Sequence, residues 1–202
     1  MIITDPNILP PGPWVVLYNN TKDPVAQGID LATHITGLDP EDHAMLSIDQ
    51  GKFVWESMSL WNAYREGPMS TFMTPGGSLK FVSLVNNSPD FTNAFKTSVQ
   101  RRLSRPGWEN SYDFLGVFGQ LVGDVIPGAQ NIIHTPGLEY CSVDVIRHLV
   151  NACPYLPKAD QLVINAIPRE TNPEKLWQII LNNPQTFNFY GQWSYTNGIT
   201  LP

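Results

Sequence analysis

The alternation of hydrophobic and polar positions along the chain predicts short strands separated by turns. Residues 14–18 form a continuous apolar run rich in β-forming side chains, and the turn-forming residues 19–21 follow it, which indicates a buried strand. Residues 43–48 and 53–56 alternate in polarity on either side of a tight turn, as is typical of a hairpin. A further strand is expected over residues 79–85.

Helical spacing of apolar residues predicts five helices. Two of them have clear start signals, because Ser88 and Asn172 each stand before a proline at the first helical position. The expected helices cover residues 25–35, 88–104, 111–120, 141–153 and 172–181. Strands and helices together predict an α+β fold. Because no linker-like run or internal repeat divides the chain, residues 1–202 are expected to form a single domain.

The composition excludes several classes of function. The chain has 202 residues, 42% apolar and 15% charged, so it can bury a core and is not expected to be disordered. Its net charge is −6 and its longest basic run is Arg101-Arg102, which argues against a nucleic-acid or anionic-membrane partner. Its apolar stretches are far shorter than the roughly 20 residues that cross a bilayer. The N-terminus lacks the features of a secretory signal, so a cytoplasmic protein is expected.

Cys141 is the first candidate for chemistry. A turn signal precedes it and an amphipathic helical pattern follows it, so it is expected at a helix N-terminus. Free N–H groups and the helix dipole stabilise a thiolate there, and they can also hold the oxyanion of an attacked carbonyl. The structural alternative is a small buried cysteine that packs under the helix. Cys153 is expected to be buried, and at about 18 Å along the same helix it is too far away for a disulfide, so both thiols are expected to be free.

A thiolate nucleophile needs a neighbouring imidazole as its base, and four histidines compete for that role. His148 shares the predicted helix but lies about 10 Å along its axis from Cys141, which is too far. His34 and His134 are expected to be solvated or capping residues. His43 begins the predicted hairpin, on the face with the less apolar residues, so it can face a cleft while its neighbours face the core.

Glu56 is the candidate that orients the His43 ring. With Asp49-Gln50 as the two-residue hairpin loop, Glu56 lies directly opposite His43. A register shifted by two positions makes the two residues diagonal neighbours on the same face, still within reach of a Glu side chain. Either register lets the carboxylate accept the ring N–H and stabilise the imidazolium. The alternative is an exposed strand carboxylate.

Four segments carry a resemblance to a known family. They are residues 42–48 (DHAMLSI), 51–57 (GKFVWES), 112–116 (YDFLG) and 140–145 (YCSVDV). This ordered set resembles the circularly permuted NlpC-type, papain-like cysteine hydrolases. In that family a histidine opens a strand, an acidic or polar residue about a dozen positions later orients it, and the cysteine follows a tyrosine at a helix start. The resemblance implies Cys141, His43 and Glu56 as the catalytic residues, no cofactor, and an antiparallel sheet packed against helices.

The expected function is that of a cysteine hydrolase or acyltransferase. It would cleave an amide or ester through a thioester, and the resemblance implies cell-wall peptides, small amides or acyl lipids as substrates. The alternative is a binding or structural module on the same scaffold, for example a component of a phage particle, which would be virion-associated. A metal site of Cys141 with His43 and His134 ranks third, because no metal-ligand spacing is present. The sequence does not indicate an oligomeric state.

Overall fold

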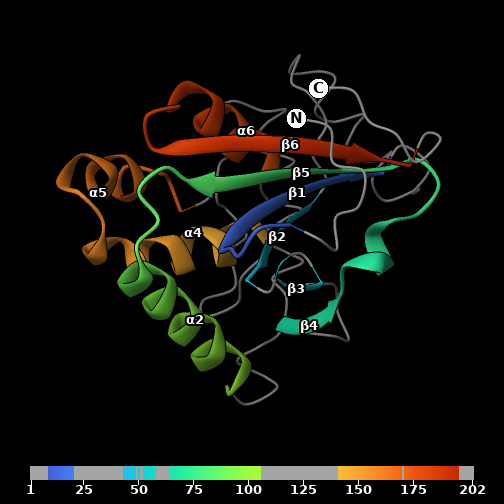
Figure 1. The fold of residues 1–202 in the computed structure, drawn as a ribbon, viewed down its shortest axis with the longest axis horizontal. Coiled ribbons are helices and arrows are strands. Elements are labelled where there is room, and N and C mark those ends of the chain that lie inside the picture. Colours follow the sequence, from blue (N-terminus) through green and yellow to red (C-terminus); the bar gives the residue numbers. More distant parts are fainter. Residues whose placement is uncertain are drawn as a thin grey trace, which may run out of the picture.

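Within the residues that the structure describes, six antiparallel strands form one sheet in the order β4-β3-β2-β1-β5-β6 (Figure 1). The computed structural model describes residues 9–20, 43–48, 50, 52–57, 64–105, 141–169 and 171–195. The strands are β1 (Trp14–Asn20), β2 (His43–Ser47), β3 (Phe53–Ser57), β4 (Tyr64–Pro68), β5 (Gly77–Leu84) and β6 (Phe187–Ser194). The first described strand, β1, therefore lies inside the sheet, between β2 and β5.

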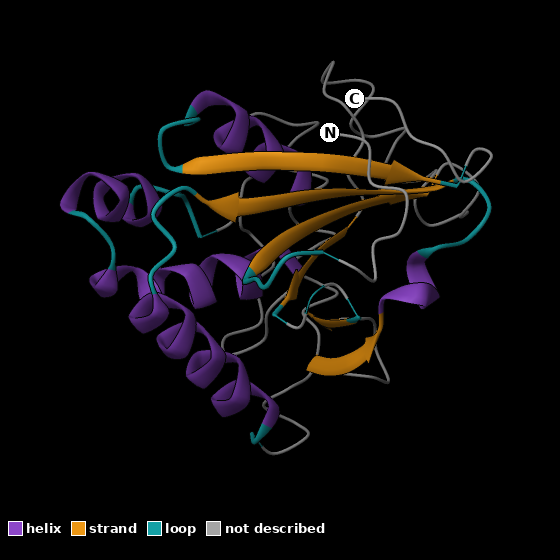
Figure 2. Ribbon diagram, viewed as in Figure 1, coloured by secondary structure: helices purple, strands orange, loops and turns teal. Residues whose placement is uncertain are grey.

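In the described part of the chain, four α-helices accompany the sheet. They are α2 (Pro89–Leu103), α4 (Cys141–Ala152), α5 (Lys158–Asn165) and α6 (Pro173–Asn182). Two short 3₁₀ helices, η2 (Met69–Phe72) and η4 (Cys153–Tyr155), connect β4 to β5 and α4 to α5. Figure 2 shows α2, α4 and α5 grouped beside the sheet, with α6 close to β6. The architecture is α+β, with an antiparallel sheet packed against helices.

Both faces of the sheet are apolar. Val15 and Leu17 of β1 point into the larger core, which the apolar sides of α2, α4, α5 and α6 complete. The neighbouring residues Trp14 and Val16 point the opposite way, into a smaller cluster closed by Met69 and Phe72. This division follows from the two-residue period of a strand, which sends successive side chains to opposite faces.

The described elements confirm most of the expected ones. The strand at residues 14–18, the hairpin, and the strand at residues 79–85 are β1, β2 with β3, and β5. The helices expected after Ser88, at Cys141 and after Asn172 are α2, α4 and α6. Those expected over residues 25–35 and 111–120 lie outside the described residues. The structure adds β4, β6 and α5, which the sequence patterns did not predict.

The hairpin takes the second of the two expected registers. Leu46 pairs with Trp55, so Glu56 stands opposite Met45 and diagonal to His43. On the face of β2 that carries His43, Met45 and Ser47 are fully buried, whereas the His43 side chain keeps an exposed fraction of 12%. Met45 belongs to the smaller apolar cluster, which the sequence pattern of one strand could not reveal.

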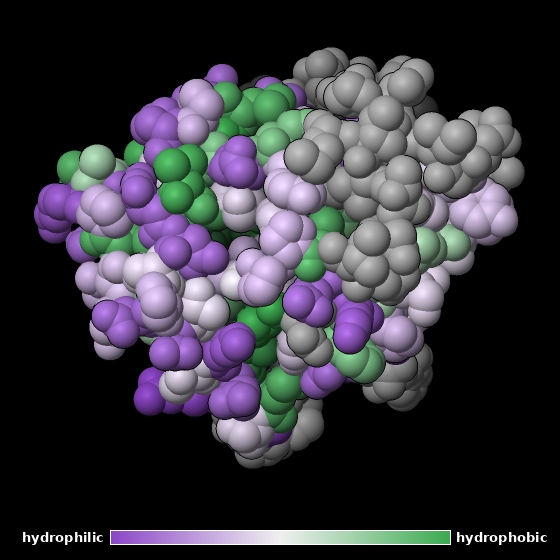
Figure 3. Space-filling view, viewed as in Figure 1, coloured by the Kyte–Doolittle hydropathy of each residue, from purple (hydrophilic) through white to green (hydrophobic). Residues whose placement is uncertain are grey.

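The surface is mixed in polarity. On the face drawn in Figure 3, hydrophobic residues form separate patches among hydrophilic ones. None of the helices in the described part of the chain is long and apolar enough to span a membrane.

Candidate active site

Cys141 is the first residue of α4, as the sequence pattern predicted. The helix forms because Val145, Ile146 and Leu149 recur on one side and are buried in the larger core. Packing of α4 against β2 and β3 brings its N-terminus to the hairpin. Cys141 is buried, with 4% of the residue exposed, and its thiol makes no disulfide.

Two contacts fix the first turn of α4. The Ser142 hydroxyl donates a hydrogen bond of 2.6 Å to the backbone carbonyl of Thr171. The Asp144 carboxylate accepts one of 3.1 Å from the Arg102 guanidinium of α2, and both of these side chains are buried. The thiol next to these anchors is therefore held on a rigid element, as a nucleophile requires.

The Glu56 carboxylate contacts both the His43 imidazole and the Arg65 guanidinium. Its Oε2 lies 2.9 Å from His43 Nε2. Its Oε1 accepts a hydrogen bond of 2.9 Å from Arg65 Nε and forms an ion pair with Arg65 Nη2 at 2.8 Å. Arg65 stands directly opposite Glu56 in the β3–β4 ladder, so the strand register itself creates this pair. The Glu56 side chain is fully buried, and its charge is balanced at both oxygens.

His43 lies between Glu56 and Cys141. Burial by itself would lower the pKa of His43, but the negative charge of Cys141 and a hydrogen bond with it, followed by the Glu56 contacts, raise the pKa to about 10. Because Glu56 occupies Nε2, Nδ1 is the ring nitrogen left to exchange a proton with the thiol. The His43 side chain is 12% exposed, so the imidazole is close to solvent.

An aromatic side chain covers the imidazole. The Phe72 ring of η2 stacks on His43, with ring centroids 6.0 Å apart and planes 20° from parallel. The Tyr18 ring packs edge-on against Phe72 at 5.0 Å, and Tyr18 stands opposite His43 across β1 and β2. This packing limits rotation of the imidazole and holds it in plane for its two partners.

The structure thus brings together the three candidate residues Cys141, His43 and Glu56. His148 is held elsewhere, since its Nδ1 lies 2.8 Å from the Ser98 hydroxyl of α2. His34 and His134 lie outside the described residues.

Sequence reasoning missed Arg65 and Phe72, both of which touch the site. Arg65 is on β4 and Phe72 is on η2, two elements without a strong local pattern. The only available signal was the spacing of Arg65 from Glu56, which suits a second hairpin.

Two further observations bear on the chemistry of the site. Among the described residues, no group of three His, Cys, Asp or Glu side chains is arranged to hold a metal ion. No protein-family model matches the chain, and neither a curated protein nor a solved structure is significantly similar to it. The geometry around Cys141 is therefore the basis for assigning a function.

Proposed function

We infer that the chain is a cysteine hydrolase or acyltransferase with a permuted papain-like fold, in which Cys141 is the nucleophile. The observation that carries this proposal is the position of His43 between the Glu56 carboxylate and the Cys141 thiol. A nucleophile, a base and a group that orients the base are the set needed for covalent catalysis. The order of these residues along the chain and their placement on β2, β3 and the start of α4 support the resemblance to NlpC-type hydrolases.

The reaction begins from the pair in which His43 already holds the proton of the Cys141 thiol, because the raised pKa of His43 favours the charged ring. The resulting thiolate attacks the carbonyl carbon of an amide or ester, and the Cys141 backbone N–H at the start of α4 stabilises the negative oxygen that develops. The imidazolium then gives its proton to the leaving amine or alcohol, which leaves a thioester on Cys141. Water or another acceptor attacks this thioester, passes its proton to His43 and releases the acyl group as an acid or a new ester or amide.

Glu56 keeps the imidazole in position and stabilises its charged form. Arg65 prevents the buried carboxylate from turning away, because it occupies the second oxygen. The substrates implied by the resemblance are cell-wall peptides, small amides and acyl lipids.

Alkylation by iodoacetamide, followed by intact-mass measurement at pH 6 and pH 8, tests the proposal. We expect rapid labelling of one cysteine already at pH 6, because the raised pKa of His43 keeps its ring charged and a neighbouring imidazolium activates a thiol. Cys141→Ala removes this label, and His43→Ala slows it about tenfold or more at pH 6. Cys141→Ser is inactive toward any substrate found, since the same imidazole does not deprotonate a hydroxyl effectively.

Cys153→Ser is the matched control. Cys153 is buried, and this burial raises the pKa of its thiol, so removing it leaves the labelling at pH 6 unchanged. Equal labelling rates in the wild type and His43→Ala would contradict the proposal and favour a non-catalytic module. The proposal would also be contradicted if the folded protein were not labelled at either pH while the unfolded chain was labelled at both cysteines.

A further inference from the structure

Gly77, the first residue of β5, lies where the turn after η2 comes very close to the end of β1. A Cβ atom at this position would stand 2.9 Å from the carbonyl oxygen of Phe72 and 3.0 Å from that of Thr74. It would also stand 3.2 Å from the Tyr18 ring. Glycine has no Cβ atom, so it permits this approach. The chain that follows Phe72 is therefore packed tightly against β1.

Side-chain hydrogen bonds hold the same turn. The Asn20 amide, at the last position of β1, donates hydrogen bonds of 2.9 Å to the Tyr18 hydroxyl and 3.2 Å to the Thr74 hydroxyl. Asn20 is buried, and Gly77 is its cross-strand partner. We name Tyr18, Asn20, Thr74 and Gly77 the clamp. Its contacts fix the Tyr18 ring, which packs against the Phe72 ring at 5.0 Å.

The Phe72 ring presents its face to the imidazole. It is stacked on His43 with the two planes 20° from parallel and the ring centroids 6.0 Å apart. The face of an aromatic ring carries negative charge density and attracts a cation within about 6 Å. Phe72 is buried, so water screens this attraction only weakly. The contact therefore favours the charged form of the His43 ring.

Charged and titratable groups surround His43 on its other sides. In the described part of the chain they are the Tyr18 hydroxyl of β1, Glu56 of β3 with its partner Arg65 of β4, and Cys141 of α4. Burial lowers the pKa of His43, whereas Cys141 and then Glu56 raise it. Phe72 is uncharged, so a substitution of Phe72 changes its own contact while all of these groups stay in place.

We propose that Phe72 is a positioning residue for His43, and that the clamp holds its ring over the imidazole. In this place the ring keeps His43 in the rotamer that reaches Cys141 and Glu56, and its face stabilises the imidazolium. Phe72 acts through His43 and is not itself a catalytic residue. The inference rests on the proposed function, because it gives Phe72 a part in activating Cys141.

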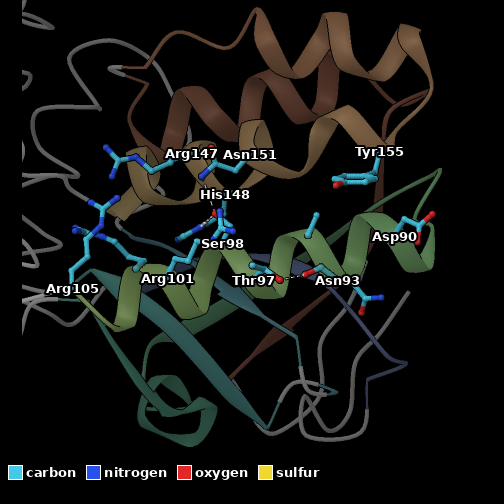
Figure 4. A pocket seen from close by; sticks show the side chains of 12 residues that line it. Asp90, Asn93, Thr97, Ser98, Arg101, Arg105, Arg147, His148, Asn151 and Tyr155 are labelled. Carbon is cyan, nitrogen blue, oxygen red and sulfur yellow. Dashed lines mark hydrogen bonds between the residues drawn. The ribbon is translucent and has the colours of Figure 1, made fainter.

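Phe72→Leu tests the proposal, because leucine keeps an apolar side chain under the imidazole but has no aromatic face. We expect the pKa of His43 to fall by about 0.4–1.5 in this variant, measured by NMR titration of the full chain labelled with ¹³C-histidine. The His43 signal is assigned by its loss in His43→Ala. His148 lies beside Ser98 in the groove between α2 and α4 (Figure 4), and its pKa, lowered by burial to about 4, separates its titration from that of His43.

Phe91→Leu is the matched control, because Phe91 is a fully buried phenylalanine of α2 in the larger core. It makes the same change of side chain away from His43 and leaves the pKa of His43 as in the wild type. An equal fall in both variants would show a general loosening of the fold and overturn the proposal. An unchanged or higher pKa of His43 in Phe72→Leu overturns it as well.

Tyr18→Phe tests the clamp. It removes the hydroxyl that binds Asn20 and keeps the ring that packs on Phe72, so it folds even if Phe72→Leu does not. With the turn held less firmly, the pKa of His43 falls by less than in Phe72→Leu. An unchanged pKa would mean that the clamp does not hold Phe72 in place, and that part of the proposal would be wrong.

The labelling of Cys141 at pH 6 separates this inference from the proposed function. If the wild type is labelled rapidly and Phe72→Leu leaves the pKa of His43 unchanged, the proposed function stands and the role of Phe72 is wrong. If the pKa of His43 falls but the wild type is not labelled, the catalytic proposal is wrong, whereas the contact between Phe72 and the charged imidazole is confirmed.

Discussion

Glu56 uses its two carboxylate oxygens for two different cations. One oxygen contacts the His43 ring and the other contacts the Arg65 guanidinium, and the side chain has no access to solvent. A buried carboxylate is stable only when both oxygens have partners of this kind. This residue therefore decides both the orientation of the imidazole and the local charge balance.

Glu56→Gln tests the orienting role. The amide keeps a polar group beside the ring but loses the charge that stabilises the imidazolium, so labelling of Cys141 at pH 6 falls to a rate between those of the wild type and His43→Ala. Circular dichroism shows the same fold. Glu66→Gln removes an equal charge from an exposed position of β4 and leaves the rate unchanged. An unaltered rate in Glu56→Gln would mean that the carboxylate has only a structural role.

At the residue scale, the sequence predicts only those contacts of the site that a local pattern along the chain determines. His43 and Glu56 share a hairpin, whose alternation places them on one face in both registers considered. The meeting with Cys141 depends on the packing of a helix about 100 residues away, which no local pattern predicts. The expectation that these residues meet rested on the resemblance of four ordered segments to NlpC-type hydrolases. Arg65 and Phe72 enter through elements whose sequences do not predict them.

At the scale of elements, β4 depends on the same charges. Among the described strands it lies at the edge of the sheet and pairs only with β3, and its sequence YREGP contains few strand-forming residues. The ion pair between Arg65 and Glu56 is a cross-strand contact in this weak ladder. The stability of the edge is therefore coupled to the geometry of the site.

Arg65→Gln is expected to lower the free energy of unfolding by about 1–3 kcal/mol, because Glu56 remains buried with one charged partner fewer. Urea unfolding measures the change, and Glu66→Gln on the same strand stays within about 0.5 kcal/mol of the wild type. If Arg65→Gln were equally neutral, the carboxylate would have found water or another donor, and the assigned coupling would be wrong.

The helices that were predicted carry local stop and start signals. The Ser88 hydroxyl accepts from the Phe91 N–H at 3.1 Å, and the Asn172 side chain accepts from the Lys175 N–H at 2.7 Å, each before a proline in the first turn. The missed helix α5 has Pro157 at its N-cap and no side-chain cap. Tertiary packing rather than local signals stabilises it, which sequence patterns do not show.

At the scale of the whole molecule, the sheet order follows from pairings that are distant in sequence. β5 pairs with β6 from Leu84 with Phe187 onward, about 100 positions apart, and β1 lies between β2 and β5. The α+β class could be predicted from the succession of elements. The order of the strands could not, because every long-range pairing depends on which apolar faces meet in the final core.

His148 lies where three parts of the molecule meet. Its ring contacts Tyr64 of β4 at 5.5 Å and Phe95 of α2 at 6.1 Å, and it is 1% exposed. Burial is the main cause that lowers the pKa of His148 to about 4; the charge of Asp144 acts in the opposite direction, and the charges of Arg147, Arg102 and Arg105 lower the pKa further. The folded molecule therefore holds this histidine neutral, whereas the unfolded chain binds a proton near pH 6.5.

Stability must consequently fall as the pH decreases from 6.5 to 4, because in this window the unfolded state binds the proton and the folded state does not. The loss reaches up to about 3 kcal/mol and is complete below the folded pKa of about 4. Urea unfolding of the wild type and of His148→Gln at pH 7, 6, 5 and 4 measures this loss. The quantity compared is the difference between their free energies of unfolding at each pH, in which the contributions of the other three histidines cancel. The wild type should lose stability relative to the variant with each step down. Parallel curves would show that His148 is protonated equally in both states, and the buried junction of β4, α2 and α4 would then have to accommodate a charge.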